Sequence, residues 1–425
     1  MSKRLIKMAA LVLAGIMLLS MPGLVGCGDD NGGGEAKTEI TLGFLGDLTG
    51  PGAYAVAEVY YGVRDYFHMV EDDNPIPGVK AKVITFDTRS GYSRVPPGYE
   101  WLKGQGAQVI GTVSGPDTVM LLDRFESDKI PSAGMSSTSE LQGHPWNFAL
   151  FSTPDGQQEA QAEVLLEWVM DNWDYQAERR SPKIGHAGLA GFRTSDTYQT
   201  GVDRILAAYP AKFDWASFQR APMGSSNWAV EITKLIDCDY IVLSMYGTSA
   251  VSFAREARLR GYEGGLLSGM EAFPGYWQLV RNAVPADRLF DCVYAHYVPA
   301  SNDLGAFMTE VWEYVARYHS EAEANSLMAG TGYPTGWAWS LWVTDAMRRA
   351  AQAVGAENVD GNALREALAS TDIEMISQGL GNDWKIDQSN GVFWCCETQR
   401  IYEWSITEEV WVQTGDWIPA PNLSG

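Results

Sequence analysis

The feature that most constrains the fold is a regular alternation of short apolar runs with longer amphipathic stretches. Strands are predicted over residues 39–45, 81–86, 108–113, 130–135, 183–188, 214–220, 240–244, 265–268 and 289–298. Helices are predicted over residues 53–70, 99–104, 119–128, 155–173, 196–209, 228–236 and 250–260. A strand–helix–strand order of this kind predicts parallel sheets covered by helices on both faces, which is an α/β fold. A chain of 425 residues is too long for one core, so two domains are expected.

The last third of the chain has a different pattern. Helices are predicted over residues 304–318, 335–353 and 362–370, and short strand-like pieces follow, including 387–391 and 410–415. The second of these helices carries a stripe of tryptophans, Trp337, Trp339 and Trp342. Large aromatic side chains at helical spacing are typical of a buried core, and we expect that role here in preference to a cofactor site.

The start of the chain indicates export. Three basic residues precede an apolar run over residues 8–19, which is too short to span a membrane. The tetrapeptide ending in Cys27, Leu-Val-Gly-Cys, resembles the lipobox of bacterial lipoproteins. The resemblance implies a signal peptide over residues 1–26, lipid attachment to the sulfur of Cys27, and an extracytoplasmic protein anchored to the bacterial membrane. The Gly-rich residues 27–37 then form a flexible tether. The alternative is an ordinary signal peptide with an incidental cysteine.

Composition excludes several classes of function. Acidic residues outnumber basic ones, 53 to 31, for a net charge of −22, which argues against nucleic acid as a partner. With five histidines and neither H-E-x-x-H nor C-x-x-C, no metal and no cofactor are expected. Neither G-x-S-x-G nor a phosphate-binding G-x-x-x-x-G-K-[ST] loop is present, so an enzyme is not expected. The pairing of Cys238, Cys292, Cys395 and Cys396 stays open, a vicinal bridge between the last two included.

A hydroxyl-rich loop is a candidate binding element. Ser136, Ser137, Thr138 and Ser139 follow the strand predicted over residues 130–135. Ligands of open α/β sheets bind at the carboxyl ends of strands, and neutral hydroxyl and N–H donors suit a small carboxylate. The alternative is a helix start, because Ser137-x-x-Glu140 fits a capping box.

Three parts of the chain resemble the periplasmic solute-binding proteins of the branched-chain amino acid transport family. They are residues 42–51 (LGFLGDLTGP), residues 109–114 (VIGTVS) taken with 130–141, and residues 239–271. The resemblance covers about residues 38–413. It implies two Rossmann-like lobes, of the periplasmic binding protein-like I type, joined by three crossings, with the ligand in the cleft between them. It places lobe 1 at residues 38–153 and 299–375 and lobe 2 at 154–298 and 376–425.

The resemblance also implies a set of ligand-binding residues. A ligand carboxylate would meet the first-lobe positions Ser114, Ser136, Ser137 and Thr138. The ammonium would meet Glu271, and the pocket walls would include Tyr54, Tyr198 and Tyr246. Three departures bear on the ligand. Gly115-Pro116 replaces a Ser-rich turn, Arg89, Tyr92 and Arg94 replace a short acidic turn, and Phe151-Ser152-Thr153 lacks the arginine common after that phenylalanine. An added arginine near the cleft would favour a diacid or an aromatic acid.

The function implied is capture of a small solute, an amino acid or a related amide or acid, for an ABC importer. Its partners would be that solute, the importer's membrane subunits and, through the lipid anchor, the membrane. The alternatives are a ligand-sensing module of the same fold that reports to a membrane kinase and, with less support, an exported hydrolase.

Overall fold

The structure, a computed structural model, describes residues 37–153, 156–269, 273–393, 395–421 and 423. The leader, the lipobox Cys27 and the acidic Glu271 lie outside the described residues, so the roles expected of them stay predictions. Among the described residues, none of the helices has both the length and the apolar character that crossing a membrane requires.

The first sheet is made entirely of parallel strands. Its order is β2-β1-β3-β4-β5, with β1 Thr38–Gly46, β2 Val79–Asp87, β3 Val109–Thr112, β4 Ser132–Ser136 and β5 Asn147–Phe151. Side chains alternate along β1: Leu42 and Phe44 enter one core, and Leu45 enters the core on the other face. Both faces of this sheet are therefore buried, as the apolar runs predict.

Helices from both ends of the chain cover the first sheet. They are α2 Ala53–Asp72, α3 Val95–Gly104, α4 Gly115–Val119, α5 Leu122–Asp128, α12 Ala306–Tyr318, α13 Glu321–Leu327, α14 Gly332–Val354 and α15 Gly361–Ala369. One core contains residues of α2, α12, α14 and α15, and the other contains residues of α3 and α5. Trp337, Trp339 and Trp342 are fully buried in the first of these cores, which confirms the prediction for the tryptophan stripe.

Helices α2 and α14 touch backbone to backbone, and glycine makes this contact possible. A Cβ added at Gly336 would lie 2.0 Å from the carbonyl oxygen of Val59, and one added at Gly62 would lie 2.2 Å from that of Tyr333. Beside this contact, the rings of Tyr66 and Trp337 pack edge to face, with their centroids 4.9 Å apart. The position of α2 therefore depends on two residues that have no side chain.

The second sheet has the order β14-β13-β10-β9-β8-β6-β7, and β15 pairs with β13. The strands are β6 Lys183–Ala190, β7 Asp214–Pro222, β8 Tyr240–Ser244, β9 Gly265–Ser268, β10 Cys292–His296, β13 Thr398–Ser405, β14 Val410–Gln413 and β15 Ile418–Pro419. Strands β6 to β10 pair in parallel, and the strands after β10 pair antiparallel. The fold is thus α/β with two lobes, each built on a sheet of parallel strands.

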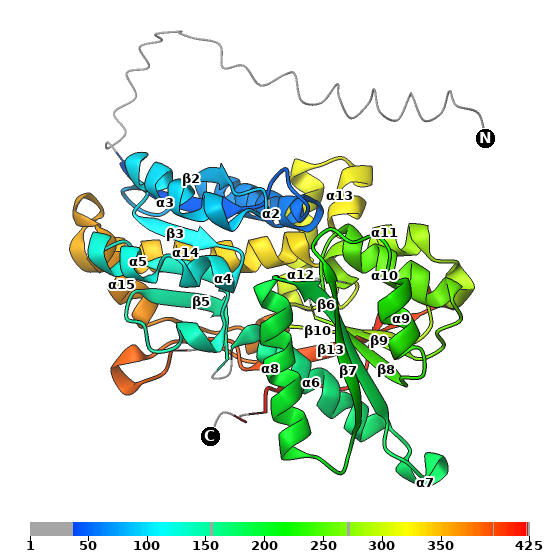
Figure 1. Ribbon diagram of the computed structural model, residues 1–425. Helices are drawn as coiled ribbons and strands as arrows, with labels where there is room; N and C mark the ends of the chain where they lie inside the picture. The colour runs from blue at the N-terminus through cyan, green and yellow to red at the C-terminus, as the bar shows by residue number, and fades with distance from the viewer. Residues whose placement is uncertain (1–36, 154–155, 270–272, 394, 422, 424–425) are drawn as a thin grey trace. The chain divides into compact units, whose positions relative to one another are not determined.

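Helices lie on both faces of the second sheet as well (Figure 1). They are α6 Gln157–Asn172, α7 Tyr175–Glu178, α8 Arg193–Ala208, α9 Ala229–Leu235, α10 Thr248–Leu259 and α11 Phe273–Ala283. Along β8, Ile241 and Leu243 join the core under α9, α10 and α11, whereas Val242 joins the core under α6 and α8.

Several local predictions are wrong. Strands β5 and β13 and helix α13 were not predicted, and residues 388–390 form a 3₁₀ turn in place of a strand. The capping box at Ser137 does not form, because Thr138 precedes the short helix Ser139–Leu141 and its side chain makes no cap. A capping box forms instead at Ser320, with Glu323. Helix α8 begins at Arg193, earlier than the predicted start at residue 196.

The four described cysteines, Cys238, Cys292, Cys395 and Cys396, are buried and free. Cys396 belongs to the core of the first sheet, as does Trp384 in the small sheet of β11 Asp372–Ile373 and β12 Trp384–Lys385. The lobe limits given above stay predictions. Because Trp384 and Cys396 pack in the core of the first sheet, these contacts favour a third crossing between the lobes after Cys396 instead of near Met375.

Candidate functional site

A cavity lies where the carboxyl ends of strands from both sheets meet. Its empty space is about 940 Å³, part of which opens to solvent. The described residues that line it are Gly46, Asp47, Gly52, Ala55, Val56, Val59, Thr88, Ser90, Tyr92, Val113, Ser114, Asp117, Ser136, Gln158, Phe192, Thr194, Met223, Tyr246 and Tyr276. Most follow a strand directly, which is where open α/β sheets bind ligands.

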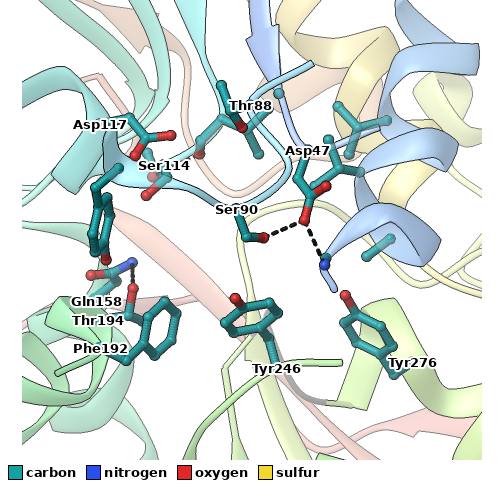
Figure 2. Close-up of a pocket in the computed structure, with 18 of the residues that line it drawn as sticks. Asp47, Thr88, Ser90, Ser114, Asp117, Gln158, Phe192, Thr194, Tyr246 and Tyr276 are labelled. Atoms are coloured by element: carbon teal, nitrogen blue, oxygen red, sulfur yellow. Dashed lines mark hydrogen bonds between the residues drawn. The ribbon is translucent and has the colours of Figure 1, made fainter. Parts of the chain in front are cut away.

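The loop after β1 is held in shape by Asp47. Its Oδ1 accepts a hydrogen bond from the Gly50 N–H at 2.5 Å, and its Oδ2 accepts one from the Gly52 N–H at 2.6 Å. The Ser90 hydroxyl donates to the same Oδ2 (Figure 2). At the end of β2, Asp87 accepts from the Leu48 N–H at 2.9 Å. The carboxylate of Asp47 therefore accepts three hydrogen bonds from within the chain and stabilises the loop that forms this wall of the cavity.

The wall after β3 and β4 contains a second acid, Asp117, beside Ser114 (Figure 2). The Asp117 carboxyl group makes no hydrogen bond or ion pair with the described residues. Burial, with a smaller contribution from the charge of Asp47, raises its pKa to about 7. The neighbouring Ser136 hydroxyl donates to the Val113 carbonyl at 3.0 Å and accepts from the Gly115 N–H at 2.9 Å. Among the described residues of this wall, Asp117 is thus the acidic side chain with unused bonding capacity.

The second sheet contributes an aromatic wall. Phe192 follows β6 and Tyr246 follows β8, and their ring centroids lie 4.8 Å apart. Tyr276 of α11 stacks on Tyr54 of α2 with ring centroids 5.7 Å apart. These rings give the cavity a largely apolar surface on which flat or branched groups can pack.

The loops of the two lobes touch beside the cavity. Arg193, at the start of α8, forms an ion pair with Glu140 in the loop after β4. Gly247 has a φ of +65°, and a Cβ there would lie 2.8 Å from the carbonyl oxygen of Pro51. Glycine is required at position 247 for two reasons: the backbone there is left-handed, and a side chain would collide with the backbone of Pro51.

Three of the predicted site residues, Ser114, Ser136 and Tyr246, line the cavity. Ser137 and Thr138 do not line it; their hydroxyl groups are buried and have no partner among the described residues. Of the three predicted residues that remain, two make other contacts and one lies outside the described residues.

Tyr198 is buried, and its hydroxyl donates to Gln161 Oε1 at 2.6 Å. Tyr54 is 37% exposed and reaches the site through its stack on Tyr276. Glu271 lies outside the described residues.

Asp117, Phe192 and Tyr276 line the cavity but were not predicted as site residues, and Tyr92 was predicted only as a departure from the family pattern. Asp117, Phe192 and Met223 closely follow predicted parallel strands, so a survey of every strand end would have found them. Tyr276 of α11 and Gln158 of α6 lie within helices and carry no signal of this kind.

The hydroxyl loop already holds a carboxylate of this chain. Glu159 of α6 accepts from the Ser139 N–H at 3.3 Å and from the Ser139 hydroxyl at 3.0 Å. Burial raises the pKa of Glu159 to about 7, although these hydrogen bonds lower it in part. Part of the donor set expected to bind an anionic ligand is therefore used internally.

The arginines near the cavity are also engaged elsewhere. Arg89 pairs with Asp87, and Arg94 donates to the Asp87 carbonyl at 3.1 Å. Arg193 pairs with Glu140. Among the described residues that line the cavity there is no lysine, arginine or histidine, so an arginine that would favour a diacid is absent from this part of the wall.

In a comparison with known protein families, a family model described as periplasmic binding protein matches residues 39–404 of this chain. No curated protein sequence matches the chain. Among solved structures, a branched chain amino acid ABC transporter protein from Thermus thermophilus with bound valine is 14% identical, with a TM-score of 0.76, and the match covers 91% of this chain and 98% of that one.

Two further structures carry other ligands in their descriptions. A fatty acid ABC transporter substrate-binding protein from Thermomonospora curvata is 17% identical, with a TM-score of 0.75 and coverage of 91% and 94%. A solute-binding protein from R. palustris in complex with 4-hydroxybenzoate is 12% identical, with a TM-score of 0.71 and coverage of 90% and 98%. At these identities the likeness shows the fold, and the ligands differ among the proteins that share it.

Proposed function

Since the chain belongs to the periplasmic binding protein family, we propose that it captures a small solute with an apolar or aromatic body in the cavity between its lobes. It is an extracytoplasmic solute-binding protein of an ABC transport system and performs no chemistry. The observation that carries the proposal is a cavity lined from both sheets, because a ligand there would contact both lobes and favour their closed arrangement.

The proposed solute class is an amino acid or a related amide or acid. The wall supports an apolar body through Val56, Val59, Val113 and the rings of Phe192 and Tyr246. Structures of the same fold are described with bound valine, isoleucine and 4-hydroxybenzoate. Of the residues that the resemblance assigns to ligand, Ser114, Ser136 and Tyr246 stay the leading candidates, because they line the cavity.

Replacing Glu271 by glutamine tests the amino-acid assignment. If this side chain binds the ammonium, the variant should bind its amino acid at least tenfold more weakly, about 1.4 kcal/mol, because a charge-assisted bond becomes a neutral one. A thermal-shift screen of the twenty amino acids and simple aromatic acids and amides finds the solute, and titration calorimetry measures the affinity. Glu263→Gln, an exposed position in the same lobe, is the matched control. Equal affinity of all three proteins would remove Glu271 from the site.

Replacing Cys27 by serine tests the anchor. A thioether lipid cannot form on a hydroxyl, so the variant should move from the membrane pellet to the soluble fraction of fractionated cells. Cys238→Ser, at a buried position in the second lobe, is the control and should stay in the pellet. Retention of the Cys27 variant in the pellet would contradict the lipid anchor.

A further inference from the structure

We propose that the solute is an organic cation, a protonated amine on an apolar or aromatic body, and that its amine pairs with Asp117. The inference rests on the proposed capture of a small solute with an apolar or aromatic body, and it assigns that solute an amine in place of the carboxylate that the resemblance implies. Four observations support it: a free carboxyl group, the charge of the wall, the state of the hydroxyl loop and the aromatic lining.

The two acids that line the cavity differ in their bonding. Asp47 accepts from the N–H groups of Gly50 and Gly52 and from the Ser90 hydroxyl, so its charge is stabilised inside the chain. Asp117 has no such partner among the described residues. A partly buried carboxylate is costly without a donor or a counter-ion, so a ligand that supplies both gains more at Asp117 than at Asp47.

The charge of the cavity favours a cation over an anion. The described lining contains two acids, Asp47 and Asp117, and no basic side chain. The nearby arginines Arg89 and Arg193 form ion pairs with Asp87 and Glu140. The protein as a whole carries a net charge of −22, which attracts cations from a distance. A carboxylate at this wall would face the charge of Asp47 and, above about pH 7, that of Asp117, with no compensating cation among the described residues that line the cavity.

The loop expected to bind a ligand carboxylate has few free hydrogen-bond donors. The Gly115 N–H is bonded to the Ser136 hydroxyl, and the Ser136 hydroxyl is bonded to the Val113 carbonyl. The N–H and hydroxyl of Ser139 are both bonded to Glu159. Of the four hydroxyls expected to hold a carboxylate, that of Ser136 is therefore committed, and those of Ser137 and Thr138 are buried and lie outside the lining, which leaves that of Ser114 in the wall.

The aromatic lining suits an organic cation. Tyr92, Phe192, Tyr246 and Tyr276 all line the cavity. The face of an aromatic ring attracts an ammonium group, and several rings beside one carboxylate form a combination suited to amines. The same rings pack against the apolar body of the ligand.

Three compounds with the same phenylethyl body test the inference by calorimetry on the Cys27→Ser protein. They are phenethylamine, a cation; phenylalanine, a zwitterion; and 3-phenylpropanoate, an anion. We expect phenethylamine to bind tightest and 3-phenylpropanoate weakest. Isopentylamine, leucine and 4-methylpentanoate form a second series with an aliphatic body, in which the same order is expected.

The Asp117→Asn variant should bind the amine at least tenfold more weakly and leave the affinity for the anion unchanged or raised. Asp123→Asn, an exposed acid in the same lobe, is the control and should match the unsubstituted protein. Asp117→Glu keeps the charge and should retain more amine affinity than Asp117→Asn. Thermal unfolding of each variant shows whether it is folded.

The pH dependence gives a second readout. Asp47, Tyr92 and Tyr246 face Asp117, and Glu140 of the adjacent turn is paired with Arg193. The pKa of Asp117 is raised to about 7, so below that pH a cation must displace a proton. Amine affinity should rise with pH up to about tenfold per unit below the pKa and level off above it, a dependence that Asp117→Asn should abolish.

The inference is overturned if an anion binds as tightly as its matched amine, or if Asp117→Asn leaves amine binding unchanged. Leucine or phenylalanine binding that depends on Glu271 and not on Asp117 would retain the proposed function and reject this inference. Absence of binding across both series and the wider solute screen would reject both.

Discussion

The Gly336→Ala variant is expected to unfold at a markedly lower temperature than the unsubstituted protein. The added Cβ would lie 2.0 Å from the Val59 carbonyl oxygen, and neither partner can rotate away, because both belong to helix backbones. Helix α2 must therefore move off α14, which we expect to cost about 3 kcal/mol, the upper part of the usual range for overpacked cores. Thermal or urea unfolding measures the loss.

Gly104→Ala is the matched control, because it lies in α3 with open space around its Cα and no positive φ. Alanine there should be neutral or stabilising by up to about 1 kcal/mol. The displacement in Gly336→Ala should also reach the cavity, since Val59 lines it. Equal unfolding midpoints for the two variants would contradict the close helix contact.

The second large effect is expected from Glu159→Gln, and it depends on pH. Burial raises the pKa of Glu159 to about 7 in the folded protein, whereas an unfolded chain has a glutamate pKa of about 4.3. Between these values the folded state holds a proton that the unfolded state has lost, so this group makes stability fall as the pH rises. Relative to the parent, the glutamine variant should gain about 3 kcal/mol between pH 4 and pH 8.

Comparison with the parent at each pH isolates this group, because the other titrating groups are common to both proteins. The buried His186 and His296, for example, have pKa values lowered by burial to about 3 and about 4, and they act in the opposite direction. Urea unfolding at pH 5, 6, 7 and 8 gives the difference. Glu126→Gln, at an exposed position of α5, is the control and should follow the parent. A pH-independent difference for Glu159→Gln would contradict the burial of this carboxyl group.

Much of the fold could be predicted, because strands buried on both faces are continuous apolar runs. The runs at β1, β8 and β9 have the predicted position to within a residue or so. Strand β5 was missed because it is a short segment, Asn147–Phe151, that follows a Pro-containing turn, and only the short 3₁₀ helix Ser139–Leu141 separates it from β4. Strand β13 alternates polar and buried residues at the edge of the parallel region, and this weaker signal was not recognised.

The site was predicted less completely than the fold. Ser114, Ser136 and Tyr246 were placed at strand ends by resemblance, and they line the cavity. The sequence could not show that Glu159, on a helix of the other lobe, reaches the hydroxyl of Ser139, because that contact depends on how the lobes fold together. Nor could it show that Asp47 is satisfied and Asp117 is not, since bonding partners follow from backbone geometry.

The tryptophan helix α14 has a consequence for the order of folding. Trp339 packs on Phe44 of β1 and donates to the Ala133 carbonyl of β4 at 2.9 Å, yet it follows them by more than 200 residues. During synthesis the first five strands therefore emerge long before the helix that covers one of their faces. Contacts of such long range form late and slow folding. Late formation of these contacts is compatible with the export that the basic and apolar first residues predict, because a secretion channel passes unfolded chains.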